Sequence, residues 1–196
     1  MLGAWKVLKS TEIFKTTFFR FRRDQCELPD GRVMPNYYVM EFPDWVNVVP
    51  VTDDGKIVLV EQYRHADGKV HLEIPGGSTN PPGQNGQGDN ESEDPKRAAI
   101  RELAEETGYV PEDVRLIGVH APNPAMQNNR MHTYIAFGCK KLQEPDLDPF
   151  EDLRTVTLPV NEVIEKVMSG EINHSIVIAS LFYALPILGF HLPTKR

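Results

Sequence analysis

The sequence predicts an α/β fold: an α/β/α sandwich with a mixed sheet, preceded by a small N-terminal antiparallel β unit. Two observations predict it. Apolar runs of strand length recur along the chain with helical segments between and after them, whereas the first forty residues hold only short extended segments. With 196 residues and 40% hydrophobic content, the chain can bury a full core as one domain, or as one domain plus a small appendage.

The β unit is expected within Trp5–Met40. Residues 13–23 partly alternate between apolar and polar side chains, and a Pro-Asp-Gly turn signal follows at 29–31. Residues 36–42 form another strand candidate. Three short strands have too little core to stand alone, so the unit must pack on the rest of the chain or on a second copy of itself.

The strands of the larger sheet are expected after a break at Pro43–Asp44, which predicts domains 1–43 and 44–196. In order, the predicted strands are Trp45–Thr52, Lys56–Arg64, Val114–His120, His132–Gly138 and Leu153–Leu158. The segment Leu72–Gly77 leads from the second of them into a long loop. Two closing helices are predicted over 161–169, where Gly170 ends the helix, and over 175–185.

A central helix has well-defined ends. Asp94 supplies a side-chain acceptor at the cap, and Pro95 lacks an N–H that would be unpaired there anyway. Gly108 can adopt the left-handed conformation just past a helix end. Between these residues, Glu102 and Glu106 are four apart and therefore share a face, with Glu105 beside them.

These three carboxylates allow two interpretations. Like charges at this spacing destabilise an isolated helix by roughly 0.2–0.5 kcal/mol per pair. A divalent cation bound between the carboxylates makes their proximity favourable, and oxygen ligands in octahedral geometry suit Mg²⁺ or Mn²⁺. Taken alone, the three residues fit equally well a solvated acidic surface with an ordinary Arg101–Glu105 pair.

The wider pattern resembles the signature of the Nudix hydrolases. That signature is a glycine, five residues, a glutamate, seven residues, and then Arg-Glu-aliphatic-x-Glu-Glu-x-Gly-aliphatic. Gly77, Glu93 and residues 101–109 fit these positions, with two departures. Tyr109 replaces the last aliphatic residue, and fifteen residues separate Gly77 from Glu93. The extra residues fall within 78–90, a polar run with glycine and proline that is typical of an exposed loop.

Other segments are similar to one branch of that family, the ADP-ribose pyrophosphatases and nucleoside diphosphate sugar hydrolases. They are Gln62–His65, Leu72–Gly77, Pro122–Ala125 and Phe150–Arg154. The resemblance covers nearly the whole chain. It implies the Nudix α/β/α architecture, a nucleotide-sugar substrate, and a homodimer formed by exchange of the N-terminal strand unit.

The resemblance also implies roles for individual residues. Glu102, Glu106 and Glu105, with the backbone carbonyl of Gly76, are expected to bind Mg²⁺, or Mn²⁺ in its place. Glu93 is expected to pair with Arg101 and so to fix the loop onto the helix. The expected substrate-binding residues are Arg64, Glu73 and Pro124. Arg64 is a candidate contact to a phosphate or the ribose because its guanidinium matches phosphate oxygens, and Glu73 would orient Arg64 or the terminal ribose.

A general base is expected in the acidic segment 142–152. The branch often takes its base from a mobile loop before the last strand, which indicates Glu151, with Asp152 and Glu144 as alternatives. A solvated acidic loop without a catalytic role is the other interpretation. Asn129 stands where relatives carry a glutamate, so that position cannot supply the base.

Composition excludes several classes of partner. The formal net charge of −7 argues against nonspecific binding to nucleic acid or to an anionic membrane. Cys26 and Cys139 are too few for a disulfide framework, which favours a reducing, cytoplasmic environment. The uncharged stretch 172–194 contains two prolines and a glycine, so a buried helix is expected there rather than a membrane span.

The sequence therefore predicts a cytoplasmic, Mg²⁺-dependent, homodimeric Nudix hydrolase. It would cleave the pyrophosphate bond of ADP-ribose or a nucleoside diphosphate sugar into a nucleoside monophosphate and a sugar phosphate. One alternative is a Nudix-fold nucleotide sensor without hydrolytic activity, although such a protein could lose a metal carboxylate and this chain keeps them all. Another is a Nudix pyrophosphatase that acts on a different dinucleotide.

Overall fold

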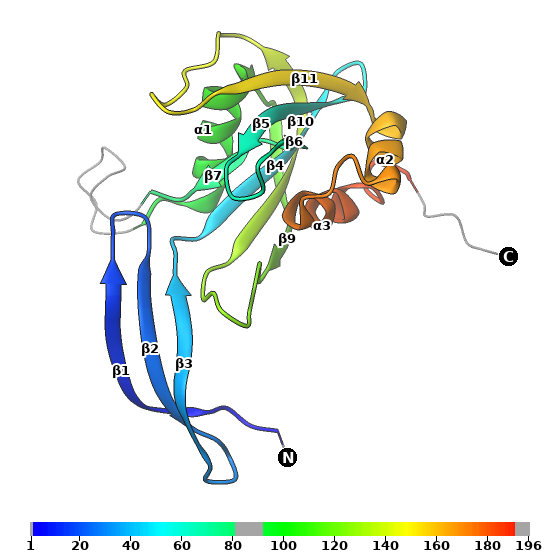
Figure 1. Cartoon of the computed structure of the whole chain (residues 1–196). Helices are drawn as coiled ribbons and strands as arrows, with labels where there is room; N and C mark the ends of the chain where they lie inside the picture. Colours follow the sequence, from blue (N-terminus) through cyan, green and yellow to red (C-terminus); the bar gives the residue numbers. More distant parts are fainter. Residues whose placement is uncertain (1, 81–91, 191–196) are drawn as a thin grey trace, which may run out of the picture. The chain divides into compact units, whose positions relative to one another are not determined.

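The computed structural model describes residues 2–80 and 92–190 (Figure 1). The chain separates into two compact units. The smaller unit consists of residues 1–44 and 120–130, and the larger of residues 45–119 and 131–196. Much of the long loop after Gly77, residues 81–91, lies outside the described residues, so the structure does not address its predicted course.

The smaller unit contains a three-stranded antiparallel sheet in the order β1-β2-β3 (Figure 1). Its strands are β1 (Lys6–Lys15), β2 (Arg20–Glu27) and β3 (Val33–Glu41). The predicted extended run over 13–23 is wrong, because a turn interrupts it. Thr16 Oγ1 accepts the backbone N–H groups of Phe18 and Phe19 there, both at 3.1 Å. Such local bonds compete with a strand ladder, and the chain reverses direction.

Residues 120–130 pack with this small sheet although they connect two strands of the larger one. The backbone N–H of Met40 donates to the carbonyl of Met126 at 2.8 Å. The hydroxyl of Tyr37 donates to the carbonyl of Ala125 at 2.7 Å. The segment that contains Pro124 is therefore held by β3.

The larger unit contains an eight-stranded mixed sheet. Its main path is β11-β5-β4-β10-β8, with β6 on β5, β7 on β4 and β9 on β10. β4 and β10 are parallel, whereas β5 is antiparallel to both β4 and β11. The strands are β4 (Trp45–Thr52), β5 (Lys56–Arg64), β6 (Lys69–Glu73), β7 (Gly76–Ser78), β8 (Tyr109–Val110), β9 (Asp113–His120), β10 (Met131–Lys141) and β11 (Leu153–Pro159).

Three helices complete this unit: α1 (Pro95–Thr107), α2 (Val160–Ser169) and α3 (Ser175–Ala184). Alternation along β4 divides the core into two layers, because successive strand side chains point to opposite faces. Val46 and Val48 pack with Leu103 of α1. Val49 and Val51 belong to the other cluster, with residues of α2 and α3. The predicted α/β/α sandwich with a mixed sheet is therefore correct.

The helix ends follow the local chemistry expected of them. The side chain of Asp94 accepts the N–H of Arg97 at 3.1 Å, and Gly108 ends α1 with φ of 75°. Gly170 ends α2 in the same way with φ of 81°. Helix α3 ends one residue before the predicted Leu185. None of the helices within residues 2–80 and 92–190 is long and apolar enough to span a membrane. Both cysteines are free thiols.

Candidate active site

Two adjacent glycines let β7 pass closely between β4 and α1. A Cβ on Gly76 would lie 2.4 Å from the backbone oxygen of Val46, and a Cβ on Gly77 would lie 2.3 Å from Oε1 of Glu102. Only a residue without a side chain leaves room for both approaches. The glycine pair thereby brings the loop backbone against the carboxylates of α1.

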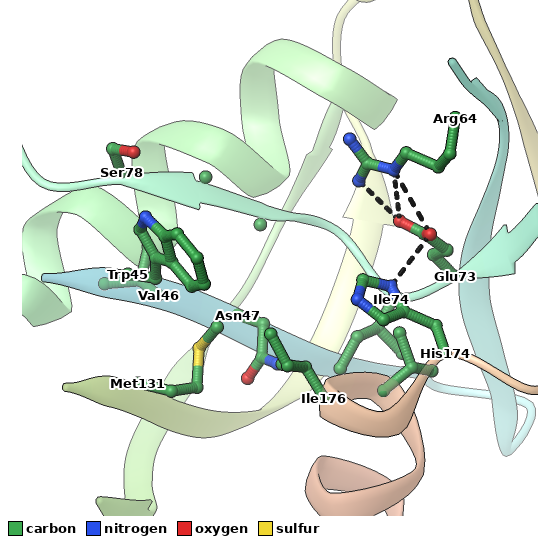
Figure 2. A pocket seen from close by; sticks show the side chains of 13 residues that line it. Trp45, Val46, Asn47, Arg64, Glu73, Ile74, Ser78, Met131, His174 and Ile176 are labelled. Atoms are coloured by element: carbon green, nitrogen blue, oxygen red, sulfur yellow. Dashed lines mark hydrogen bonds and ion pairs between the residues drawn. The ribbon is translucent and has the colours of Figure 1, made fainter. Parts of the chain in front are cut away.

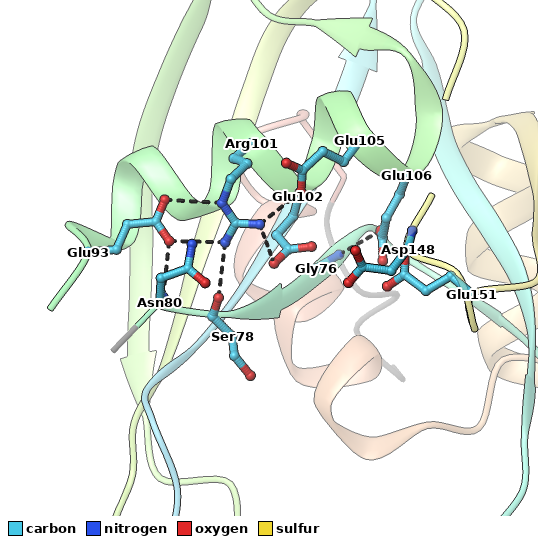
Figure 3. A network of polar contacts seen from close by, with 10 residues as sticks. All are labelled: Gly76, Ser78, Asn80, Glu93, Arg101, Glu102, Glu105, Glu106, Asp148 and Glu151. Atoms are coloured by element: carbon cyan, nitrogen blue, oxygen red, sulfur yellow. Dashed lines mark hydrogen bonds and ion pairs between the residues drawn. The ribbon is translucent and has the colours of Figure 1, made fainter. Parts of the chain in front are cut away.

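Arg101 joins the loop to the helix (Figure 3). Its Nε and Nη2 donate to the two carboxylate oxygens of Glu93 at 3.1 and 3.0 Å. Nη1 donates to Glu102 at 3.0 Å and to Glu105 at 2.8 Å, and Nη2 also reaches the carbonyl of Ser78. Burial lowers the pKa of Arg101, but its partners outweigh burial and the pKa is raised. The Arg101–Glu93 pair expected from the resemblance and the ordinary Arg101–Glu105 pair are thus both present.

Glu93 is a structural anion at the entry to α1. One oxygen accepts the backbone N–H of Asn80 at 3.1 Å, and the N–H of Glu93 donates to the carbonyl of Asn80 at 2.9 Å. Burial raises the pKa of Glu93, yet the hydrogen bonds from Arg101 and Asn80 outweigh it and lower that pKa. Glu93 therefore stays ionised and holds the end of the loop.

Glu102 and Glu106 behave in the opposite way. Burial, followed by the charge of Glu102, raises the pKa of Glu106 to about 8, although Glu106 accepts the N–H of Gly76 at 3.0 Å. Burial also raises the pKa of Glu102 to about 7, and the charges of Glu105 and Glu151 add to this effect. Both carboxylates therefore stand where positive charge would stabilise their ionised forms.

This donor set fits a hard divalent cation, since it consists of carboxylate oxygens whose ionised forms need a counter-charge. As the side chains stand, the described residues contain no group of three His, Cys, Asp or Glu that could hold a metal ion. In this arrangement Glu102 and Glu105 are instead paired with the guanidinium of Arg101.

The acidic segment before β11 is attached to the same helix. The N–H of Leu142 donates to the carbonyl of Gly108, and that of Asp146 to the carbonyl of Glu105. Further along, Oε2 of Glu151 accepts the N–H of Asp148 at 3.1 Å. The charge of Glu151 raises the pKa of both Glu102 and Glu106, so it lies close to them (Figure 3). Glu144, an alternative base, instead pairs with Lys141 at 3.3 Å.

A cavity of about 330 Å³ opens beside Gly76 and Gly77 (Figure 2). Its walls come from β4, the ends of β5 and β6, β7, the start of β10 and the start of α3. One end is apolar and includes Trp45, Met131 and Ile176. The other end is polar and contains Arg64, Glu73 and His174. The space is thus suited to a ligand with both an apolar and an anionic part.

Comparison with known proteins identifies the framework that carries this site. Residues 42–180 match the NUDIX domain, and residues 5–40 match the nucleoside diphosphate sugar hydrolase N-terminal domain. The chain belongs to the Nudix family. Within it, these matches and the similar proteins given below place the chain in the ADP-ribose pyrophosphatase and nucleoside diphosphate sugar hydrolase branch, as a Nudix pyrophosphohydrolase.

Individual proteins are similar over most of the chain, and a solved structure shares its fold. The chain is 32% identical to a methanol dehydrogenase activator of Bacillus methanolicus over 91% of each chain. It is 27% identical to an ADP-ribose pyrophosphatase of Bacillus subtilis over 85% of each chain. A crystal structure of an ADP compounds hydrolase has the same fold, with a TM-score of 0.79, 21% identity and 96% coverage of both chains.

The structure brings most of the predicted Nudix site residues together. Glu93, Arg101, Glu102 and Glu105 form one network, and Glu106 and Glu151 lie next to it. Arg64 and Glu73 contact each other at the cavity. Pro124 belongs to the smaller unit and is not among the residues that line this cavity.

Among the cavity residues that were not predicted as site residues are His174 and Trp45. His174 precedes α3, and its Nδ1 lies 2.9 Å from Oε1 of Glu73, a residue 101 positions away in the chain. The sequence around His174 contains no local pattern that predicts a contact with a residue so far away in the chain. Trp45 was predicted only as the first residue of a strand. Its position opposite Ser78 in the β4–β7 pair brings it to the cavity wall.

Proposed function

We propose that this Nudix protein hydrolyses the pyrophosphate bond of ADP-ribose or a nucleoside diphosphate sugar, giving a nucleoside monophosphate and a sugar phosphate. The observation that carries the proposal is the pair of buried carboxylates, Glu102 and Glu106, whose pKa values are raised beside the glycine loop. Such a pair is costly unless a cation compensates it. The adjacent cavity with Arg64 supplies a place for the rest of a phosphorylated substrate.

The metal fits the residues that the resemblance assigns to it. Glu102, Glu106, Glu105 and the carbonyl of Gly76 would hold Mg²⁺, or Mn²⁺ in its place. When bound, the metal supplies charge neutralisation at the phosphates and lowers the pKa of a bound water.

The chain's own residues account for the remaining requirements. Arg64 binds a phosphate oxygen or the ribose through its guanidinium, which matches such oxygens in a planar fork. Glu151 accepts the proton of the attacking water as the new P–O bond forms and the bridging P–O bond breaks. The N–H of Asp148 is accepted by Oε2 of Glu151, so the proton can be taken by Oε1. Glu93 and Arg101 hold the loop against α1 during the reaction.

A coupled phosphatase assay tests the proposal. ADP-ribose, ADP-glucose, UDP-glucose and GDP-mannose are each incubated with the protein, Mg²⁺ and alkaline phosphatase, which releases phosphate only from the monoester products. We expect phosphate release from at least one of these substrates. The metal requirement is measured without alkaline phosphatase, by chromatography of the nucleotide products, and EDTA in place of Mg²⁺ should abolish cleavage there. The ranking identifies the preferred base and sugar. Absence of release from every member, with binding of ADP-ribose retained, would instead support a nucleotide sensor.

The proposal also includes a homodimer. The smaller unit leaves large apolar side chains of its outer strand exposed, among them Ile13 at 49% and Phe14 at 54% of full exposure. A second copy of the unit would cover them, in line with the exchange of N-terminal strands that the family resemblance implies.

A further inference from the structure

Glu73 lies between two basic side chains at the polar end of the cavity. Nε and Nη2 of Arg64 donate to it at 3.1 and 2.5 Å, and Nδ1 of His174 lies 2.9 Å from its other oxygen. Figure 2 shows Arg64 and His174 on opposite sides of this carboxylate. An ionised carboxylate only accepts hydrogen bonds, so Nδ1 of His174 carries the proton and donates it.

The carboxylate is almost completely buried, with 3% of its side chain exposed, whereas 44% of the Arg64 side chain is exposed. Burial raises the pKa of Glu73, but the hydrogen bonds from His174 and Arg64 outweigh burial and lower that pKa to about 2. Glu73 is therefore a fixed anion held from two sides. A guanidinium attached to a fixed anion has a fixed direction.

Arg64 retains donor capacity for a ligand. Glu73 occupies Nε and Nη2, and no hydrogen bond joins Nη1 to any residue among 2–80 and 92–190. Burial lowers the pKa of Arg64, but Glu73 and then the charges of Glu106 and Glu151 raise it, so Arg64 lies within electrostatic reach of these last two carboxylates. The guanidinium is thus placed between the cavity and the carboxylates of α1.

His174 does not serve the helix that it precedes. It occupies the cap position of α3, yet its side chain makes no capping hydrogen bond to that helix. Ser, Thr, Asp and Asn at this position usually accept the first N–H groups of their helix. Here the ring is directed to Glu73 instead, and it also lines the cavity.

We propose that His174 is a positioning residue for substrate binding: through Glu73 it fixes the guanidinium of Arg64 toward an anionic oxygen of the substrate's diphosphate. This inference rests on the proposed function for the identity of the anion. It adds that the start of α3, far from the signature in sequence, sets where the substrate is held.

Three variants of His174 separate the hydrogen bond from the bulk of the ring. His174→Asn places an amide N–H near the position of Nδ1 and should retain the bond to Glu73. His174→Phe keeps the ring without a donor, and His174→Gln places its amide near Nε2, so both should lose the bond. We expect KM for the best substrate to rise about tenfold in the Phe and Gln variants, with kcat within twofold, because a bond to a charged group is lost. His174→Asn should restore KM.

The action through Arg64 is tested by a double-mutant cycle. Arg64→Ala should itself raise KM, and adding His174→Phe to Arg64→Ala should raise it no further. His65→Ala removes an exposed histidine next to Arg64 and is the control, with KM within twofold of wild type. An unchanged KM in both the Phe and Gln variants, a loss confined to kcat, or a full effect of His174→Phe without Arg64 would each overturn the inference.

A measurement that needs no turnover separates this inference from the proposed function. If the wild-type protein hydrolyses no member of the panel, the proposed function fails, and the ¹⁵N-NMR signal of Arg64 Nε–H decides the inference alone. We expect slow exchange and a distinct shift for this N–H in wild type and in His174→Asn, and both lost in His174→Gln. The same signal in all three proteins would overturn the inference.

Discussion

Glu73 and Glu106 are both almost fully buried, with 2% and 4% exposure, yet their pKa values shift in opposite directions. Burial acts on both in the same sense, so the difference comes from their partners. Glu73 has Arg64 and His174, whereas Glu106 has one backbone N–H and the repelling charges of Glu102 and Glu151. At the scale of residues, the structure thus distinguishes a carboxylate whose ionised form is stabilised by two basic neighbours from one whose ionised form is disfavoured by its surroundings.

Glu106→Gln tests whether the negative charge of Glu106 is needed for turnover. The amide still accepts the N–H of Gly76, so we expect the fold and Tm to be preserved. Loss of the negative charge should lower kcat by roughly 100-fold or more, since charge stabilisation at a phosphoryl centre depends on it. Steady-state kinetics with the best substrate and circular dichroism measure the two effects.

The matched control for that variant is Glu165→Gln, the same chemical change at an exposed position of α2. It should alter neither kcat nor Tm. A fully active Glu106→Gln protein would remove Glu106 from the metal site.

Glu73→Gln tests whether the ionised carboxylate of Glu73 stabilises the fold, through the pH dependence of the free energy of unfolding. The pKa of Glu73 falls from 4.5 in the unfolded chain to about 2 in the fold, so its contribution to stability is full above about pH 4.5. It is then lost as pH falls toward 2, and the shift corresponds to about 3 kcal/mol. Wild type should therefore be more stable than the variant at pH 7, and the gap should narrow between pH 4.5 and 3. Urea unfolding across this range measures the gap; a constant gap would contradict the prediction.

At the scale of elements, the two glycines of β7 face different neighbours. The Cβ of Gly76→Ala would meet backbone atoms of β4, which cannot move aside, and overpacking of this kind costs about 1–3 kcal/mol. The Cβ of Gly77→Ala would meet only the end of the Glu102 side chain, which can rotate. We expect Gly76→Ala to lower the free energy of unfolding, and Gly77→Ala to lower kcat with a smaller change in stability. Denaturant titration and kinetics on both variants test this, and equal losses of stability would contradict it.

Strands and helices with strong local signals could be predicted closely. β4 and β5 have the predicted bounds, and α1 begins and ends where Asp94, Pro95 and Gly108 indicate. The β1–β2 turn was missed because Thr16 makes it without the glycine or proline that usually marks a turn. The two-residue strand β8 is too short to have a periodic pattern of its own.

In the site too, features with a local sequence signal could be predicted and features without one could not. Residues within the signature could be predicted because they are close in sequence and one helix sets their spacing. The contact of His174 with Glu73 depends on the tertiary structure that brings the residue before α3 to the end of β6, which no local pattern encodes. That Arg101 engages three carboxylates together was likewise beyond a pattern that names only pairs.

At the scale of the whole molecule, the role of the N-terminal strands can be tested by removing them. Deletion of residues 1–41 takes away β1, β2 and β3, and with them the exposed apolar side chains that a second copy would cover. We expect a monomeric or inactive product, measured by light scattering after size exclusion and by the panel assay. A fully active monomer would contradict the dimer.

Because deletion also removes partners of residues 120–130, a point variant is the sharper control. Phe14→Glu in the full-length chain leaves those contacts intact and should weaken self-association. Lys9→Glu, on the same strand, replaces one charged side chain with another and should not.

The attachment of the acidic segment to α1 has a consequence for protein engineering. Carbonyls of Glu105 and Gly108 hold the backbone of residues 142–146, and a Cβ on Gly108 would lie 2.0 Å from the carbonyl oxygen of Gln143. The C-terminal end of α1 and residues 142–146 therefore form one structural unit. A chimera that takes only residues 147–152 from a homologue keeps the hydrogen bonds between residues 142–146 and the end of α1. A chimera that begins the exchange at residue 142 must also take the end of this helix from the homologue.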